Sequence, residues 1–81
     1  MVSIEKTVGE VIRELRDFRG ITQLELARRV EISNTYLSDI ENDRTEPSLK
    51  IIRKIARGLN VDWRDIFLLT KYVNNGQKRK Y

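Results

Sequence analysis

Apolar residues recur at helical spacing in successive stretches of the chain, and polar start and stop signals bound each stretch. In the first stretch Val8, Val11, Ile12 and Leu15 share one face, and Gly20 follows at a position where helices commonly end. The spacing predicts helices over residues 8–19, 23–30, 34–42, 49–59 and from residue 63 onward. Because no stretch alternates in the manner of a β-strand, the pattern predicts an all-α fold with five helices.

Residues 22–41 are the most informative segment, because two short helices follow each other there with almost no connection. Thr22 opens the first, and Glu25 three residues later completes the sequence signature of a capping box. Ser33 opens the second helix, and only Val30-Glu31-Ile32 joins the two. Helices joined so closely cannot pack side by side as an antiparallel hairpin. They have to cross steeply, as in the DNA-binding helix-turn-helix.

Short motifs spread over residues 8–69 agree with this interpretation. In chain order they are Val8-Gly9-Glu10, Ile12-Arg13-Glu14-Leu15-Arg16, Gly20-Ile21-Thr22-Gln23, Leu26-Ala27, Tyr36-Leu37-Ser38, Ile40-Glu41, Pro47-Ser48-Leu49 and Ile55-Ala56. Together they resemble the Cro and phage-repressor type of helix-turn-helix proteins, the XRE family. The resemblance implies a compact five-helix bundle of the lambda-repressor-like DNA-binding type. It also implies a homodimer that binds a palindromic operator in double-stranded DNA.

Two positions depart from the family pattern. The turn between the second and third helices often holds glycine where this chain has Glu31. A glutamate with positive φ would cost roughly 1 kcal/mol, so we expect a slightly different turn. Gly58 stands inside the fourth helix where alanine is usual, at a cost of about 1 kcal/mol.

The residues expected to reach base edges follow from helical geometry. On the helix over 34–42, Leu37 and Ile40 point inward, and the first outward positions enter the major groove. The candidates for base contact are Asn34, Thr35, Ser38 and Asp39. Asn can pair with adenine, and the Thr methyl can meet thymine. Asp39 can accept from cytosine, pair with a base-contacting cation or exclude wrong bases. The alternative is that all four are ordinary solvated positions.

A second set of residues is expected at the DNA backbone: Gln23, Tyr36, Arg44 and Lys50. The resemblance implies a phosphate role for Gln23, where the helix N-terminus offers free N–H groups; the alternative is an exposed glutamine without a role. Tyr36 either donates its hydroxyl to a phosphate or packs its ring against the fourth helix. Arg44 lies in the polar loop that follows the third helix.

Arg16 and Glu41 are charged residues at otherwise apolar spacing. The resemblance implies a buried salt bridge between them, tying the first helix to the end of the third. We interpret the pair as structural.

The C-terminal part carries more apolar surface than a small bundle can cover. Leu68, Leu69, Tyr72 and Val73 are the candidates for a two-fold dimer contact. The alternative is that they fold back over the first and fourth helices. We therefore expect one DNA-binding domain with a C-terminal dimerisation segment over residues 1–73, and a disordered basic tail over residues 74–81.

Composition narrows the functional classes. The 81 residues contain no cysteine and no histidine, which excludes disulfides, thiolate or imidazole metal sites, and Cys or His catalysis. Of the 16 basic residues, three lie in the tail, so the remaining 13 nearly balance the 12 acidic residues. DNA binding then depends on where the charges lie. The N-terminus lacks a signal peptide and no stretch approaches a membrane span, so we expect a cytoplasmic protein with no cofactor, metal or small-molecule ligand.

The sequence predicts a transcriptional regulator, most simply a repressor or autoregulator. A protein-interaction adaptor or antitoxin-like module using the same bundle is the alternative, and an apolar or acidic outward face on the third helix would favour it. An enzyme is not expected. Asp39, Glu41 and Asp43 lie on different sides of a helix end, and the chain has no glycine-rich phosphate loop.

Overall fold

The computed structural model describes residues 6–70, and all regular structure in this part of the chain is helical. The helices are α1 (Val8–Arg19), α2 (Gln23–Val30), α3 (Asn34–Glu41), α4 (Leu49–Leu59) and α5 (Trp63–Leu69). The predicted all-α bundle is confirmed. The third helix ends one residue earlier than predicted, because Asn42 leaves the helical conformation. The predictions for Tyr72, Val73 and the 74–81 tail lie outside the described residues.

Each helix begins at a polar side chain that accepts a hydrogen bond from the backbone of the first turn. These residues are Thr7, Thr22, Ser33, Ser48 and Asp62, all in extended conformation. Thr7 and Glu10 form a complete capping box, whereas the box predicted at Thr22 is only half formed. The Glu25 carboxylate instead accepts from Arg29 at 3.4 Å, one turn further along α2. A charged partner at i+4 replaces the return bond to the backbone.

One buried apolar cluster holds the bundle together, and every helix contributes to it. Ile12, Leu26, Leu37, Ile55 and Ile66, one from each helix, have no exposed surface. Burial of these stripes is what turns five short helices into a stable fold, since isolated helices of this length are marginal in water.

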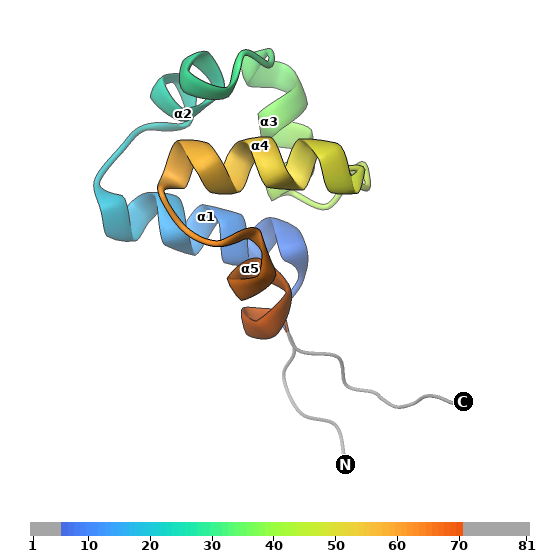
Figure 1. Cartoon of the computed structure of the whole chain (residues 1–81). Helices are drawn as coiled ribbons and strands as arrows, with labels where there is room; N and C mark the ends of the chain where they lie inside the picture. The colour runs from blue at the N-terminus through green and yellow to red at the C-terminus, as the bar shows by residue number, and fades with distance from the viewer. Residues whose placement is uncertain (1–5, 71–81) are drawn as a thin grey trace.

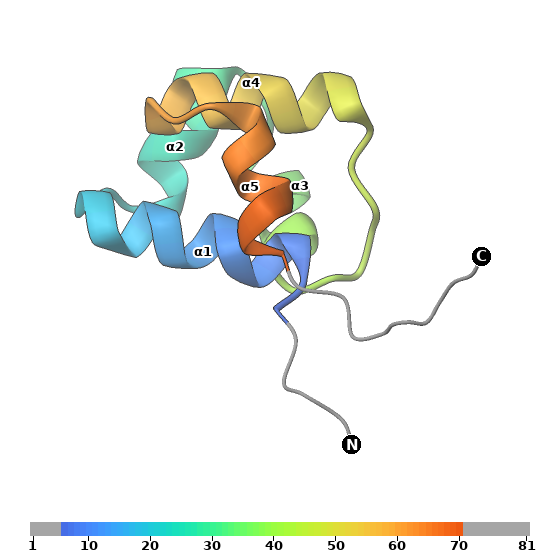
Figure 2. The same ribbon diagram turned by 60° about the horizontal axis from the view of Figure 1, so that its bottom comes forward.

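The helices are arranged around α4. It packs against α2 on one side and against α5 on the other, and α1 closes the bundle against α3, α4 and α5. Figure 1 shows α2 and the start of α3 across α4 from α5, and Figure 2 shows α5 lying over α1 and α4. The two sides of α4 are therefore different surfaces of the molecule.

Gly58 explains how closely α2 and α4 approach. A Cβ atom at this position would lie 2.5 Å from Cγ1 of Val30 and 3.1 Å from Cδ1 of Leu26. Alanine has the higher helix propensity and would favour α4 itself. Its Cβ atom would nevertheless overpack the contact between α4 and α2. The glycine seats α2, and hence the turn to α3, against the rest of the bundle.

Candidate nucleic-acid interface

The turn between α2 and α3 sets the angle at which α3 leaves the bundle. Glu31 adopts the left-handed conformation, with φ 61° and ψ 44°. The Glu31 N–H donates to the Arg28 carbonyl at 3.3 Å, and the Ile32 N–H donates to the Ala27 carbonyl at 3.0 Å. These two bonds form a Schellman motif. The expectation of a different turn is wrong: this glutamate takes the conformation usual for glycine, because the hydrogen bonds and the half-buried Ile32 fix the chain reversal.

The first turn of α3 presents two polar side chains to solvent. Asn34 and Thr35 are exposed, while Leu37 and Ile40 are buried. The Ser33 hydroxyl accepts from the Tyr36 N–H at 2.9 Å and so fixes this turn. The result is a short polar helix end that protrudes from an apolar support.

Ser38 and Asp39, one turn further along, are only half exposed. The Asn42 amide donates to the Ser38 carbonyl at 2.9 Å and approaches its hydroxyl at 3.4 Å. Arg13 of α1 donates to the Asn42 amide oxygen at 3.0 Å. Asn42 was not singled out for this role from the sequence, because the link depends on a residue from another helix.

Asp39 and Arg44 lie together. The Arg44 guanidinium donates through Nη1 to Asp39 Oδ1 at 3.3 Å, and the Arg44 backbone N–H donates to the Asp39 carbonyl at 2.8 Å. Asp39 therefore has a cationic partner in this structure, the side chain of Arg44. A candidate for base contact and a candidate for phosphate contact thus form one unit at the end of α3.

Gln23 is held in place by the ion pair between Arg16 and Glu41. Glu41 is 1% exposed, and its carboxylate accepts two bonds from Arg16, at 2.8 and 3.0 Å. A third comes from the Gln23 amide at 3.1 Å. The hydrogen bond to the Glu41 carboxylate is the main reason that the pKa of the Arg16 guanidinium is raised. The first residue of α2 and the last of α3 therefore share one polar network.

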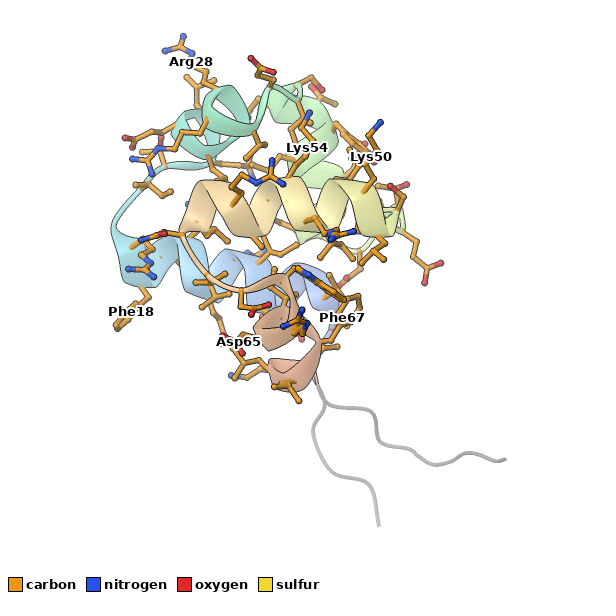
Figure 3. All side chains as sticks on the ribbon, in the orientation of Figure 1. Phe18, Arg28, Lys50, Lys54, Asp65 and Phe67 are labelled. Atoms are coloured by element: carbon orange, nitrogen blue, oxygen red, sulfur yellow. The ribbon has the colours of Figure 1, made fainter. Side chains whose placement is uncertain are left out.

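Tyr36 and Lys50, the remaining candidates for contact with the DNA backbone, differ in solvent exposure. Tyr36 is half-buried with its ring against the apolar core, and Lys50 is exposed at the start of α4. Figure 3 shows Lys50, Lys54 and Arg28 on the side of α4 where α2 and α3 lie, whereas Asp65 and Phe67 belong to α5 on the other side. These three basic side chains therefore lie on the same side of α4 as α3.

The candidates for dimer contact that the structure describes are exposed. Leu68 and Leu69 leave 72% and 48% of their surface accessible. Phe18, on α1, is 84% exposed and was not singled out from the sequence, since it is an isolated apolar residue among charged ones.

Between residues 6 and 70, no group of three or more Asp and Glu side chains gathers as metal ligands. No helix in this part of the chain has the length and apolar character needed to cross a membrane.

Five helices with α2 and α3 crossing through a tight turn define a helix-turn-helix bundle of the DNA-binding type. The helix-turn-helix family model HTH_3 matches residues 12–66. The chain is 42% identical over 55 residues to the immunity repressor protein of Bacillus phage phi105, a match that covers 68% of this chain and 38% of the phage protein. The chain belongs to this helix-turn-helix family, and the proteins similar to it include phage repressors and transcriptional regulators.

Solved structures of regulators also share the fold of this chain. The restriction-modification controller protein C.AhdI from Aeromonas hydrophila is 32% identical with a TM-score of 0.72, covering 74% of this chain and 91% of that one. SinR, a master regulator for biofilm formation solved in complex with DNA, is 29% identical with a TM-score of 0.71, covering 75% and 98%. The chain spans only 38% to 63% of the length of the first curated relatives it matches.

Proposed function

We propose that the chain is a sequence-specific regulator of transcription that binds double-stranded DNA through α3 in the major groove, as a repressor or autoregulator. The observation that carries this is the exposed pair Asn34 and Thr35 on the first turn of α3. Helix-turn-helix proteins read base edges with this part of the recognition helix. The outward face is neither apolar nor acidic at its tip, which argues against an adaptor that uses the same surface for protein contacts.

Base recognition is assigned to the residues of α3. The Asn34 side-chain amide can donate to N7 of adenine and accept from its N6 amino group, and Thr35 offers a methyl group to thymine. Ser38 and Asp39 follow one turn later. Because Arg44 neutralises part of the Asp39 charge at 3.3 Å, the carboxylate can approach the groove with less repulsion from the phosphates.

Backbone contacts are assigned to residues that frame α3. Gln23 lies at the N-terminus of α2, where free N–H groups attract a phosphate, and the Glu41 network fixes its side chain. Arg44 and Lys50 supply positive charge at the other end of α3. Tyr36 is the weakest of the four, because its ring is half-buried against the core.

The proposal includes a homodimer on a palindromic operator. Leu68 and Leu69 are exposed apolar residues at the end of α5, and Tyr72 and Val73 would extend the contact beyond the described residues. A two-fold axis here would set two copies of α3 about 34 Å apart, on successive turns of the groove. Residues 1–73 would form this unit and 74–81 a basic tail, and the protein would act in the cytoplasm.

The test is selection of bound duplexes from a random DNA pool by the purified protein at near-physiological salt. We expect an enriched palindrome whose half-sites are about ten base pairs apart. Enrichment of a single half-site would support base reading by α3 and contradict the dimer. Weak, salt-sensitive binding without enrichment would contradict the proposal and favour a protein-interaction module.

A further inference from the structure

A basic cleft lies between the C-terminal half of α4 and the start of α5. Its volume is about 270 Å³, and three of its lining residues are arginines: Arg53, Arg57 and Arg64. Among the described residues that line it, Asp62 is the one carboxylate, and it pairs with Arg64 at 3.5 Å. Three guanidinium groups therefore face one acid, and the cleft has an excess of positive charge.

The indole of Trp63 holds two of these arginines in place. The Arg53 guanidinium lies 5.4 Å from the Trp63 ring centroid, and that of Arg64 lies 5.5 Å away. Phe67 packs edge-on against the same ring, with centroids 5.9 Å apart. Stacking on an aromatic face restricts a long side chain, so less freedom is lost when the guanidinium binds an anion.

The apolar part of the lining completes the site. The half-buried Val61 gives aliphatic surface beside the cationic groups, whereas Ala56 is only 1% exposed and contributes almost none. Within residues 6–70 the structure gives Arg53 and Arg57 no carboxylate partner. Neither the proposed base contacts nor the proposed backbone contacts use any of these residues.

The cleft lies on a different side of the molecule from the recognition helix. α5 packs on α1 and α4, whereas α2 packs on α3 and α4, and Figure 1 shows α2 and α5 on opposite sides of α4. A duplex seated on the first turn of α3 would leave the α4–α5 cleft uncovered. A free cationic and aromatic cleft on a DNA-bound protein is placed to meet another protein.

We propose that this cleft binds an acidic segment of a partner protein, in which aspartate or glutamate residues flank an aliphatic side chain. The carboxylates would pair with Arg53 and Arg57, for which a guanidinium has matching bidentate geometry. The aliphatic side chain would lie on Val61 and the Trp63 ring. The excess positive charge selects the acidic partner, and the apolar lining distinguishes a peptide from a bare phosphate backbone.

The experiment uses the full chain and a short fluorescein-labelled peptide in which aspartate and leucine alternate. Because Trp63 is the only tryptophan, its fluorescence reports binding at the cleft, while peptide anisotropy gives the affinity. We expect saturable binding with a change in tryptophan emission. The same peptide with asparagine in place of aspartate should not bind.

Charge variants locate the site. Arg53→Gln and Arg57→Gln should each raise the Kd of the peptide about threefold to fivefold, as expected for an exposed ion pair. Arg28→Gln removes the same charge from an exposed position on α2 and should leave the Kd unchanged. Equal weakening in all three variants would mean that only net charge attracts the peptide, and would overturn the proposal.

A second arm separates a protein partner from DNA. A short duplex that lacks the selected operator is added to the peptide complex. We expect the peptide to stay bound. Displacement of the peptide, with a change in Trp63 emission that Arg57→Gln abolishes, would overturn the proposal and identify the cleft as a DNA-backbone site. Duplex selection by Arg57→Gln should match that of the unaltered chain, so failure of the cleft proposal is distinguishable from failure of the proposed function.

Discussion

The Arg16 guanidinium donates two hydrogen bonds to the Glu41 carboxylate, Nε to Oε2 at 2.8 Å and Nη2 to Oε1 at 3.0 Å. Arg16 also donates to the Ile21 carbonyl at 3.0 Å, so one side chain connects α1, the α1–α2 connection and the end of α3. Glu41 in turn orients Gln23. The Arg16–Glu41 pair, interpreted from the sequence as structural, thus also positions Gln23, for which we propose a contact with the DNA backbone.

Removing one partner of this pair should destabilise the fold strongly. Arg16→Ala removes two of the three hydrogen bonds to the Glu41 carboxylate, which is 1% exposed, and the loss of a buried partner costs about 3–5 kcal/mol. Thermal unfolding followed by circular dichroism should show a large fall in Tm. Arg28→Ala, at an exposed position, serves as the control and should change Tm little. An unchanged Tm for Arg16→Ala would show that the pair does not support the fold.

Gly58 allows a sharper test, because two effects oppose each other there. Helix propensity favours Gly58→Ala by about 1 kcal/mol, but the new Cβ would lie 2.5 Å from Cγ1 of Val30. Overpacking of this kind costs about 1–3 kcal/mol, so we expect a net loss of stability. In the double variant with Val30→Ala the two costs should be markedly less than additive, since the truncated side chain leaves room for the methyl group. A more stable Gly58→Ala protein would show that α2 can move away from α4 without cost.

The helix starts could be predicted from the sequence, because caps are local. Thr7, Ser33 and Asp62 each act on a backbone group within three residues. Contacts across helices could not be predicted in the same way. Gly58 looks like a weak point of α4 until Val30 is placed against it.

In the candidate site, too, features within one helix could be predicted from the sequence, and contacts between chain segments could not. That Asn34 and Thr35 point outward follows from the positions of Leu37 and Ile40 on one helix. The hydrogen bond from Gln23 to Glu41 and the pair of Arg44 with Asp39 depend on how chain segments meet. The left-handed Glu31 was unexpected because the favourable Schellman bonds around it are not visible in residue preferences.

The contributions of the Thr35 methyl and hydroxyl groups to base recognition can be tested separately. Thr35→Val keeps a methyl group and removes the hydroxyl, while Thr35→Ser does the reverse. If the methyl meets a thymine, Thr35→Ser should lose about 1 kcal/mol or more of discrimination at one operator position, and Thr35→Val should retain it. Asn34→Ala should relax specificity at a different single position, by about 1–3 kcal/mol. Competition binding with singly altered operators measures both. Uniform loss across all positions would contradict base contact.

Arg44 is expected to act on affinity and not on sequence preference. Arg44→Gln should weaken binding to all duplexes alike and reduce the slope of log K against log salt by about 1. Arg64→Gln removes the same charge on the other side of α4 and serves as the control. A change of preferred base after Arg44→Gln would show instead that Arg44 acts through Asp39, 3.3 Å away.

The dimer contact can be tested on the described residues alone. Leu68 is 72% exposed, and Leu68→Lys would place a charge in a contact that the proposal makes apolar. We expect the dimer dissociation constant, measured by sedimentation equilibrium, to rise at least about tenfold, which corresponds to 1.4 kcal/mol. Phe18→Lys also replaces an exposed apolar side chain by a charge, but on α1, and should leave the dissociation constant unchanged. If Phe18→Lys separates the dimer and Leu68→Lys does not, the two-fold axis lies at α1 and the spacing of the recognition helices has to be derived again from there.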